Sequence, residues 1–449
     1  MKRTLLILAN VFFSLVGYAN VETTIDGLKY SLDTDAKTAS VIQNHYRKQE
    51  YNIPRQIDYD GVSYSVTSIG DRAFYYREEL MAITIPNSVE TIGDEAFYNC
   101  TSLRNVVIPN SVTSIGSGAF NWCRGLVSVT IPNSVTTIGE NAFRACTSLL
   151  TLEIPNSVTT IGSAAFQHCE SLVYVSLPKT LTYLGDNLFR ACIKLSSVTV
   201  PDSVKTIGNG AFSDCSSLVN VNISGSVKTI GSEAFQNCSS LYHINIPNSV
   251  TNIGGAAFYS SGLLSITLPN SLTSIEESTF ASCSNLSVVK IPGNVKVIGS
   301  EAFANCYNLD DVYCYTQDPS SVPTAKNAFG NSYYNYHSFS VYVFPGMKEA
   351  FKNSEDWQIY NISEISEEEA KIVGINDAVE AEHDIRILSS NGKVIIKANE
   401  AGLPVSVYSV NGSLVASDCT CGNETTLDID GKGVYVVRVG KSKAVKVRL

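Results

Sequence analysis

Cysteine is the residue type in this chain with the clearest capacity for chemistry. The 449-residue sequence contains 12 cysteines, and nine of them recur at nearly constant spacing: Cys100, Cys123, Cys146, Cys169, Cys192, Cys215, Cys238, Cys283 and Cys306. Thiols can form disulfides, bind soft metal ions or act as nucleophiles. A zinc site is not indicated, because no pair of cysteines or histidines has the C-x-x-C or H-x-x-x-H spacing of such sites. We therefore expect no metal.

The regular spacing of the cysteines predicts a column of buried thiols. Equivalent positions of stacked repeats would bring the Cα atoms close, but the Cβ vectors would run parallel, which is poor geometry for a disulfide. Free cysteine packs well as a small apolar residue. Ser261 takes the place of cysteine in one repeat. We favour the thiol column, and disulfides remain the alternative for an exported protein.

No catalytic constellation stands out among the other reactive side chains. Of the five histidines, His168 and His243 occupy repeat positions that elsewhere hold Asn, Ser or Ala. The serine-hydrolase elbow G-x-S-x-G, the zinc-protease H-E-x-x-H, a phosphate loop and a dinucleotide fingerprint are absent from the sequence. We therefore expect a protein that is not an enzyme and that has no cofactor.

Aromatic and arginine side chains flank the cysteines in the first half of the chain. Tyrosine, tryptophan and arginine dominate the energetics of protein interfaces. We predict a protein-contact patch, led by Trp122, from the following residues: Tyr76, Tyr98, Trp122, Arg124, Arg144 and Arg190. The alternative is that these side chains only shield the edges of the fold.

All of these residues belong to one repeated unit. Its clearest copy is Ile131–Glu153, IPNSVTTIGENAFRACTSLLTLE. A phenylalanine recurs every 23 residues from Phe74 to Phe258, then the spacing shortens by one to Phe280, and Phe303 follows 23 later. A fixed period of this size is the signature of a solenoid.

The unit can be interpreted position by position. Leu149-x-x-Leu152-x-Ile154 alternates as a short strand, and Pro155 ends it. Gly162 indicates a backbone conformation that other residues resist. Ala165-Phe166-x-x-Cys169 has the spacing of one helical or 3₁₀ turn. Stacking of the units would bury the Phe, Cys and Ile positions in one continuous core.

The repeat C-x-S-L-x-x-V-x-I-P-N-S-V-T-x-I-G-x-x-A-F resembles the BspA-like leucine-rich repeats of bacterial surface proteins. The resemblance covers roughly Ile69–Tyr313. It implies an α/β repeat solenoid, a right-handed superhelix of 23-residue units with a parallel sheet and short helical turns. It also implies adhesion to matrix glycoproteins and co-aggregation of cells.

The segments outside the repeats differ from them in composition and in hydrophobic pattern. Residues 1–19 have the basic start and apolar run of a secretory signal peptide, and 20–68 are predicted to be a β-rich N-terminal cap. The repeats occupy 69–313, a C-terminal cap 314–362 and an acidic linker 363–384. We expect the aromatic residues of 314–362 to seal the last coil rather than to bind a ligand.

Residues 385–449 read as seven short strands separated by turns, which predicts a small all-β sandwich. Val405-x-Val407-Tyr408-x-x-Asn411-Gly412 and Gly433-Val434-Tyr435-x-Val437-x-Val439 resemble the C-terminal sorting domain of the type IX secretion system. The resemblance implies contact with the secretion machinery, export across the outer membrane and attachment to the cell surface. The alternative is an accessory adhesion or spacer domain.

The net charge and the distribution of apolar residues limit the possible functions of the chain. A net charge of −10 argues against nucleic-acid binding, and no segment after the signal peptide is apolar enough to span a membrane. Two outward columns of the predicted strands are mostly small and polar, with no pocket for a metabolite. We expect a secreted or outer-membrane-attached, adhesin-like protein that binds extracellular or host matrix proteins. The alternative is a glycan-binding or nutrient-capture surface module.

Overall fold

The computed structural model describes residues 21–43, 47–322, 328–330, 339–367, 369–370, 385–390, 393–398, 404–409, 414–419, 425–429, 434–439 and 443–448. The signal peptide predicted for 1–19 and most of the linker predicted for 363–384 lie outside these residues. The chain forms a larger unit, Met1–Asp310 with Ser321–His337, and a smaller unit, Asp311–Ser320 with Ser338–Leu449. We describe each unit by itself.

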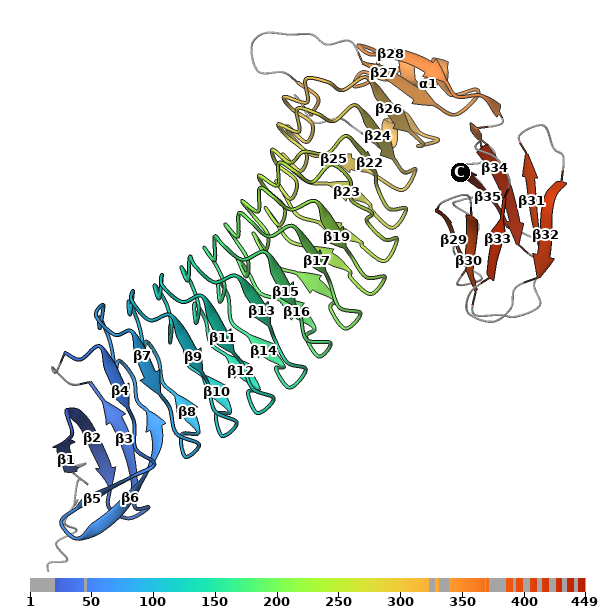
Figure 1. Cartoon of the computed structure of the whole chain (residues 1–449). Helices are drawn as coiled ribbons and strands as arrows, with labels where there is room; N and C mark the ends of the chain where they lie inside the picture. Colours follow the sequence, from blue (N-terminus) through green and yellow to red (C-terminus); the bar gives the residue numbers. More distant parts are fainter. Residues whose placement is uncertain are drawn as a thin grey trace, which may run out of the picture. The chain divides into compact units, whose positions relative to one another are not determined.

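The larger unit is a β-solenoid whose coils stack along its length, which confirms the predicted fold (Figure 1). Most of the predicted strands pair in parallel with the strand of one adjacent coil, and Val129 pairs with Val106 at the same position of the preceding coil. These strands form what we call the outer ladder: β7 (Ala82–Thr84), β9 (Asn105–Val107), β11 (Ser128–Thr130), β13 (Thr151–Glu153), β15 (Tyr174–Ser176), β17 (Ser197–Thr199), β19 (Asn220–Asn222), β22 (Ser265–Thr267) and β24 (Val288–Ile291).

A second parallel ladder runs along the solenoid, and the sequence analysis did not predict it. It forms at the dipeptide, most often Thr-Ile, that precedes the position of Gly162 in the repeat, where Ile161 pairs with Ile138 and both side chains are buried. Its two-residue strands are β8 (Thr91–Ile92), β10 (Ser114–Ile115), β12 (Thr137–Ile138), β14 (Thr160–Ile161), β16 (Tyr183–Leu184), β18 (Thr206–Ile207), β20 (Thr229–Ile230), β21 (Asn252–Ile253), β23 (Ser274–Ile275) and β25 (Val297–Ile298). Two residues are too few to give a strand periodicity in the sequence.

A column of phenylalanines forms the centre of the solenoid. From Phe74 to Phe329, neighbouring rings stack with centroids 5.0–5.7 Å apart and planes within 15° of each other. Phe74 to Phe303 are fully buried or nearly so. Because each ring contacts the rings of both adjacent coils, one coil alone cannot bury its own phenylalanine, which explains why the unit must repeat.

The segment around each phenylalanine is a series of turns and not the predicted helical turn. Ala164 and His168 have φ of 55° and 59°. Such left-handed residues interrupt an α-helix or a 3₁₀-helix. Their amides donate to the next coil, with Ala164 N to Asp186 O at 2.8 Å and His168 N to Arg190 O at 2.8 Å. Alternate amides of the segment therefore hold the coils together, whereas others keep single-turn bonds within the coil, such as Cys169 N to Phe166 O at 3.3 Å.

Glycine in the repeat serves close packing between coils. The φ of Gly162 is not in the left-handed region, so the conformational reason predicted for it is wrong. A Cβ at this position would lie 2.4 Å from the backbone nitrogen of Glu140 in the preceding coil. Any larger residue would therefore push two coils apart.

The cysteine column is buried and its thiols are free, as predicted. Each thiol donates to the phenylalanine carbonyl of the preceding coil; Cys169 Sγ lies 3.3 Å from Phe143 O. Burial raises the pKa of Cys169 and of Cys215 to about 12. In the repeat that lacks cysteine, Ser261 Oγ lies 3.2 Å from Cys283 Sγ. The column thus contributes hydrogen bonds between coils and is protonated at neutral pH.

The N-terminal region extends both ladders of the solenoid. β6 (Val62–Ile69) pairs with β8, and β4 (Glu50–Asn52) pairs with β7. The ring of Tyr51 lies 5.3 Å from the ring of Phe74 and covers the first member of the phenylalanine column. The remaining strands of this region are β1 (Val21–Ile25), β2 (Leu28–Asp33), β3 (Thr38–Ile42) and β5 (Gln56–Tyr59).

The smaller unit begins with the parallel strands β26 (Asp311–Cys314), β27 (Ser340–Val343) and β28 (Asn361–Glu364). The helix α1 (Lys348–Lys352) places Phe351 against the fully buried Trp357, with ring centroids 5.3 Å apart. The short helix η1 spans Pro319–Ser321.

The rest of this unit is all β, as predicted. It has one antiparallel sheet of β29 (Ile385–Ser390), β30 (Lys393–Ala398) and β33 (Thr425–Asp428). A second antiparallel sheet contains β31 (Pro404–Ser409), β32 (Leu414–Cys419), β34 (Val434–Val439) and β35 (Lys443–Arg448).

Candidate binding surface

The first coils of the solenoid present large side chains from a left-handed backbone position. Tyr76, Asn99 and Trp122 occupy equivalent positions two residues after the phenylalanine, with φ of 57°, 58° and 64°. Hydrogen bonds to the next coil hold each of them, such as Tyr76 N to Tyr98 O at 2.8 Å. The same position carries the small residues Ala145 and Ala191 further along, so the scaffold does not itself require an aromatic residue there.

Three tyrosines gather beside this position. The Tyr75 and Tyr98 rings stack with centroids 5.0 Å apart, and the Tyr76 ring lies 4.7 Å from Tyr75 and 5.5 Å from Tyr98. Arg72 lies over the Tyr75 ring at 5.4 Å and forms an ion pair with Glu95, Nε to Oε2 at 2.6 Å. Burial is the largest cause of the raised pKa of Tyr98, followed by its two neighbouring tyrosines. The cluster is therefore packed, with its outer ring, Tyr76, 47% exposed.

Two of these tyrosines, Tyr76 and Tyr98, border a surface depression of about 340 Å³. Its lining consists of Tyr76, Glu78, Tyr98, Asn99, Thr101, Trp122 and Arg124. The Arg124 guanidinium lies over the Trp122 ring at 4.4 Å, and Asn99 Nδ2 donates to Glu78 Oε1 at 2.9 Å. The depression thus combines aromatic faces with one carboxylate, one amide, one hydroxyl and one guanidinium group.

The structure divides the predicted protein-contact patch into two groups. Tyr76, Tyr98, Trp122 and Arg124 all line the depression. Arg144 and Arg190 lie on later coils and do not line it. Whether the four grouped residues contact a protein stays a prediction.

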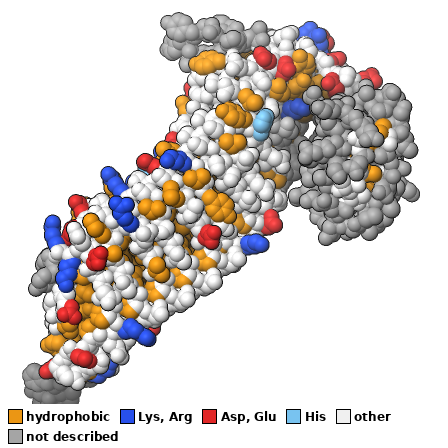
Figure 2. All heavy atoms as spheres, in the orientation of Figure 1, with side chains coloured by type: hydrophobic (Ala, Val, Ile, Leu, Met, Phe, Trp, Pro, Cys, Tyr) orange, Lys and Arg blue, Asp and Glu red, His pale blue; other side chains and the backbone are white. Residues whose placement is uncertain are grey.

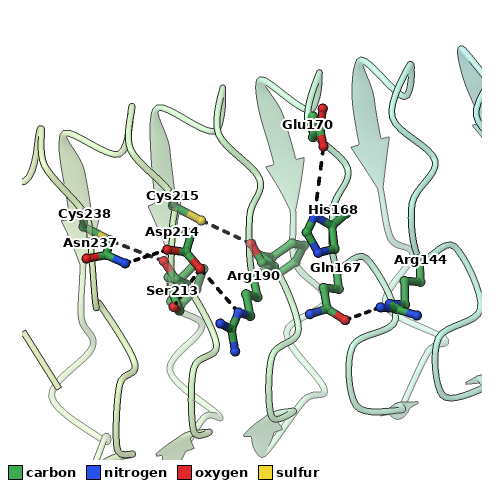
Figure 3. A network of polar contacts seen from close by, with 12 residues as sticks. Arg144, Gln167, His168, Glu170, Arg190, Ser213, Asp214, Cys215, Asn237 and Cys238 are labelled. Atoms are coloured by element: carbon green, nitrogen blue, oxygen red, sulfur yellow. Dashed lines mark hydrogen bonds and ion pairs between the residues drawn. The ribbon is translucent and has the colours of Figure 1, made fainter. Parts of the chain in front are cut away.

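Arg144 and Arg190 instead hold neighbouring coils together (Figure 3). Arg144 Nε donates to Gln167 Oε1 at 2.9 Å, and Arg190 Nε lies 3.3 Å from Asp214 Oδ2. Asp214 also accepts a hydrogen bond from Asn237 Nδ2 at 2.7 Å. Sequence alone could not separate these arginines from Arg124, because the partners lie about one repeat away.

The two outward columns of the outer ladder lie as the repeat register predicts. Ser128 pairs with Asn105 and Thr130 with Val107, and the side chains of these strands alternate between the core and solvent. Their outward residues are mostly polar, apart from exposed members such as Val107, 70% exposed, and Tyr174, 50% exposed.

A third exposed column was missed by the sequence analysis. It lies immediately after the buried leucine that precedes each outer strand, and most of its members are 40–48% exposed. We name the following residues the apolar column: Met81, Val127, Leu150, Val173, Val219, Tyr242 and Leu264. Backbone hydrogen bonds join successive members, such as Val173 N to Leu150 O at 2.9 Å. The signal in the sequence was an apolar residue that follows the buried leucine in most repeats. Figure 2 shows hydrophobic side chains along one face of the solenoid among mostly uncharged polar residues.

The described thiols are buried away from solvent. Burial raises the pKa of the column thiols, which keeps them protonated and inaccessible as nucleophiles. In the described ranges, no group of three or more His, Cys, Asp or Glu residues is arranged to hold a metal ion. The described helices include none that is long and apolar enough to cross a membrane.

Comparison with known protein families decides the classification of the repeats. The profile of the "BspA type Leucine rich repeat region" matches 67–195, 140–261 and 205–336, which together exceed half of the chain. The chain belongs to the BspA-type leucine-rich repeat family.

Solved structures of this repeat class are similar to the chain. A leucine-rich repeat protein from Bacteroides ovatus ATCC 8483 is 29% identical, with a TM-score of 0.60 over 77% of this chain and 100% of the other. A leucine rich cell surface protein from Faecalibacterium prausnitzii A2-165 is 30% identical, with a TM-score of 0.51 over 70% of this chain and 94% of the other. A search of curated proteins gives no match. The family assignment therefore concerns the repeat scaffold.

Proposed function

We propose that this BspA-type protein is a non-enzymatic, adhesin-like protein of the bacterial surface that binds extracellular proteins along its solenoid. The apolar column is the observation that carries this proposal. Members on seven coils expose apolar side chains in one line, and adjacent coils of the solenoid bring them next to each other. Exposed apolar surface of this extent is typical of protein interaction sites, because its burial is favourable only when a partner covers it.

The polar side chains around the column support the same proposal. Protein interfaces commonly combine an apolar centre with a polar rim. The outward Ser, Thr and Asn residues of the outer ladder provide hydroxyl and amide groups beside the column. Two residues that follow the same leucine position, Arg104 and Ser196, interrupt the column with polar groups. The partner we propose is an extracellular matrix or host surface protein with an extended apolar stripe.

The experiment is a binding assay of the full chain on a panel of purified extracellular matrix glycoproteins. A double substitution, Leu150→Ser with Val173→Ser, removes the centre of the column. We expect it to weaken binding at least about tenfold, which corresponds to ~1.4 kcal/mol. Val297→Ser is the matched control, because Val297 is 50% exposed but lies in β25 of the second ladder. Equal binding by the double variant and the control would contradict the proposal.

The proposed location at the cell surface rests on the two ends of the chain. We propose that 1–19 direct secretion and that 385–449 act as a type IX sorting domain recognised by the secretion machinery. The F. prausnitzii relative, which its description names a cell surface protein, supports a surface location for this scaffold. Antibody detection on intact cells, with and without 385–449, tests the route. Undiminished surface signal without 385–449 would favour the alternative of a spacer domain.

A further inference from the structure

The depression at Tyr76, Tyr98 and Trp122 has a chemical composition that the proposed protein-binding surface does not need. Its volume of about 340 Å³ lies at the small end of the 300–1,000 Å³ range that is typical of ligand sites. It lies on the first coils, and later coils of the same chain hold small residues such as Ala145 and Ala191 at the equivalent position. The bulky side chains that form it are thus additions to the scaffold.

These bulky side chains stand on a left-handed backbone position that every coil shares. A non-glycine residue in the left-handed region costs roughly 1–2 kcal/mol, and bulky residues are uncommon there. Tyr76 and Trp122 have φ of 57° and 64° and both face the depression, whereas Ala145, Ala191 and Ser260 hold the same position elsewhere. Asp214 and Asn237 adopt the same conformation in other coils, so the conformation belongs to the repeat and the size of the Tyr76 and Trp122 side chains distinguishes the depression.

The aromatic side chains provide a flat apolar platform. The Tyr76 ring is 47% exposed and lies 5.5 Å from the Tyr98 ring, so it is supported from behind and open to solvent. A supported, exposed ring can cover the C–H face of a sugar ring, whose axial hydrogens form an apolar surface. Aromatic side chains suit this role because one side is apolar and the tyrosine hydroxyl remains polar.

The polar lining suits the hydroxyl groups of the same ligand. Asn99 fixes one oxygen of the Glu78 carboxylate at 2.9 Å, which leaves the second oxygen for a ligand hydroxyl. Arg124 is fixed over Trp122 at 4.4 Å, and it forms no ion pair with the carboxylates of the described residues. Carboxylate, amide and guanidinium groups are planar and present paired acceptors or donors, which match adjacent hydroxyls.

The charges in the depression favour a neutral ligand. Glu78 and Arg124 contribute one carboxylate and one guanidinium. A cation stacking on the Trp122 ring would meet the Arg124 guanidinium already there, and an anion would meet Glu78. A neutral polyhydroxylated ring avoids both repulsions and uses both groups as hydrogen-bond partners.

From this geometry we propose that the depression formed by Tyr76, Glu78, Asn99, Trp122 and Arg124 is a binding site for one residue of a neutral saccharide. This site is separate from the protein-binding apolar column. Failure of the saccharide test therefore leaves the protein-binding proposal standing, and the reverse also holds.

Tryptophan fluorescence provides a direct test, because the chain has two tryptophans and only Trp122 lines the depression. Trp357 is fully buried in the smaller unit and gives a constant background. The full chain is titrated with neutral mono- and oligosaccharides of glucose, galactose, mannose and N-acetylglucosamine. We expect a saturable change in Trp122 emission with at least one of these series.

Two variants at one position separate ring stacking from other effects. Tyr76→Ala should weaken the titration at least about tenfold, equivalent to ~1.4 kcal/mol, whereas Tyr76→Phe keeps the ring and should bind within about threefold of the wild type, equivalent to ~0.7 kcal/mol. Tyr242→Ala is the matched control, an exposed tyrosine of the apolar column. Thermal unfolding of each variant confirms that it is folded.

Four results would overturn the proposal, and three of them concern the titration itself. They are no saturable response to any neutral series, a response that survives Tyr76→Ala, and a response confined to acidic or cationic sugars. If Trp122 emission responds instead to a matrix glycoprotein stripped of its glycans, the depression is part of a protein interface and the saccharide proposal is wrong.

Discussion

The buried and the exposed columns of this solenoid follow opposite rules. Along the core, Phe and Cys recur coil after coil in nearly identical geometry, with each phenylalanine ring 5.0–5.7 Å from the next. On the surface, one position holds Tyr76, Trp122, His168 and Asp214 in different coils at almost the same φ. The backbone is therefore insensitive to what the exposed positions carry. This difference indicates that stability depends on the repeated residues, whereas binding depends on the variable ones.

The largest loss of stability should follow a substitution in the phenylalanine column. Phe166→Ala removes a ring that is fully buried between two others, and we expect it to destabilise the fold by ~3–5 kcal/mol. Chemical denaturation monitored by circular dichroism measures this loss. A loss below about 1 kcal/mol, the size of an average substitution, would show that the column is not the main source of stability.

The second largest loss of stability should follow a substitution of the repeat glycine, which sets the distance between coils. In Gly162→Ala the new Cβ would lie 2.4 Å from Glu140 N, so two coils must separate or distort. We expect a cost of ~1–3 kcal/mol, as for other overpacked sites. Gly61→Ala is the control that lacks the steric contact, because nothing lies within 4 Å of a Cβ at this position. Its φ of 77° means that this variant reports backbone strain alone. The unfolding midpoints of both variants are measured. An unchanged midpoint for Gly162→Ala would show that close packing of the coils does not require glycine at this position.

The thiol column predicts a loss of stability at alkaline pH. Burial raises the pKa of Cys169 and Cys215 from an ordinary value of 9.0 to about 12, so between these values the folded state holds protons that the unfolded state has lost. The stabilisation is complete below pH 9 and decreases as the pH rises toward 12, by up to ~1.4 kcal/mol per pH unit and thiol.

Cys169→Ala with Cys215→Ala should therefore flatten the decline in unfolding free energy between pH 9 and 12. Denaturation curves at a series of pH values measure the slope for both proteins. If the slopes are identical, the thiols are not protonated in the folded state in the way that their burial implies.

The smallest effect on stability should come from the exposed columns. Leu150 and Val173 are 48% and 46% exposed, so their replacement by serine should change the unfolding free energy by about 0.5 kcal/mol or less per site. Thermal unfolding of Leu150→Ser with Val173→Ser measures this. A loss comparable to that of Phe166→Ala would mean that the apolar column belongs to the core.

The repetitive part of the fold was predictable from sequence for a physical reason. A strict spacing of 23 residues places Phe on Phe and Cys on Cys whatever the details of the coil, so the core and the outer ladder follow directly. The helix predicted at Ala165–Cys169 does not continue beyond single-turn hydrogen bonds, because Ala164 and His168 are left-handed, and neither residue type indicates that conformation. The second ladder was missed since its strands have only two residues.

The candidate site was predictable only in part. Residue type singled out Tyr76, Tyr98, Trp122 and Arg124, and register brings them together because they lie on three successive coils. The sequence analysis did not select Glu78, Asn99 and Thr101, because acidic, amide and hydroxyl groups are common at exposed positions. Their significance comes from proximity to the rings, which requires the turn geometry and not just the repeat spacing.

The separation of stability from binding is tested most directly by one multiply substituted protein. In it, Tyr76, Trp122, Leu150, Val173 and Tyr242 are all replaced by serine while every buried column is retained. Its affinity for matrix glycoproteins that bind the wild-type chain is the decisive measurement, with thermal unfolding as the check on folding. We predict a folded protein whose binding is reduced by about a hundredfold or more, equivalent to ~2.7 kcal/mol. Wild-type affinity in this folded variant would contradict the account.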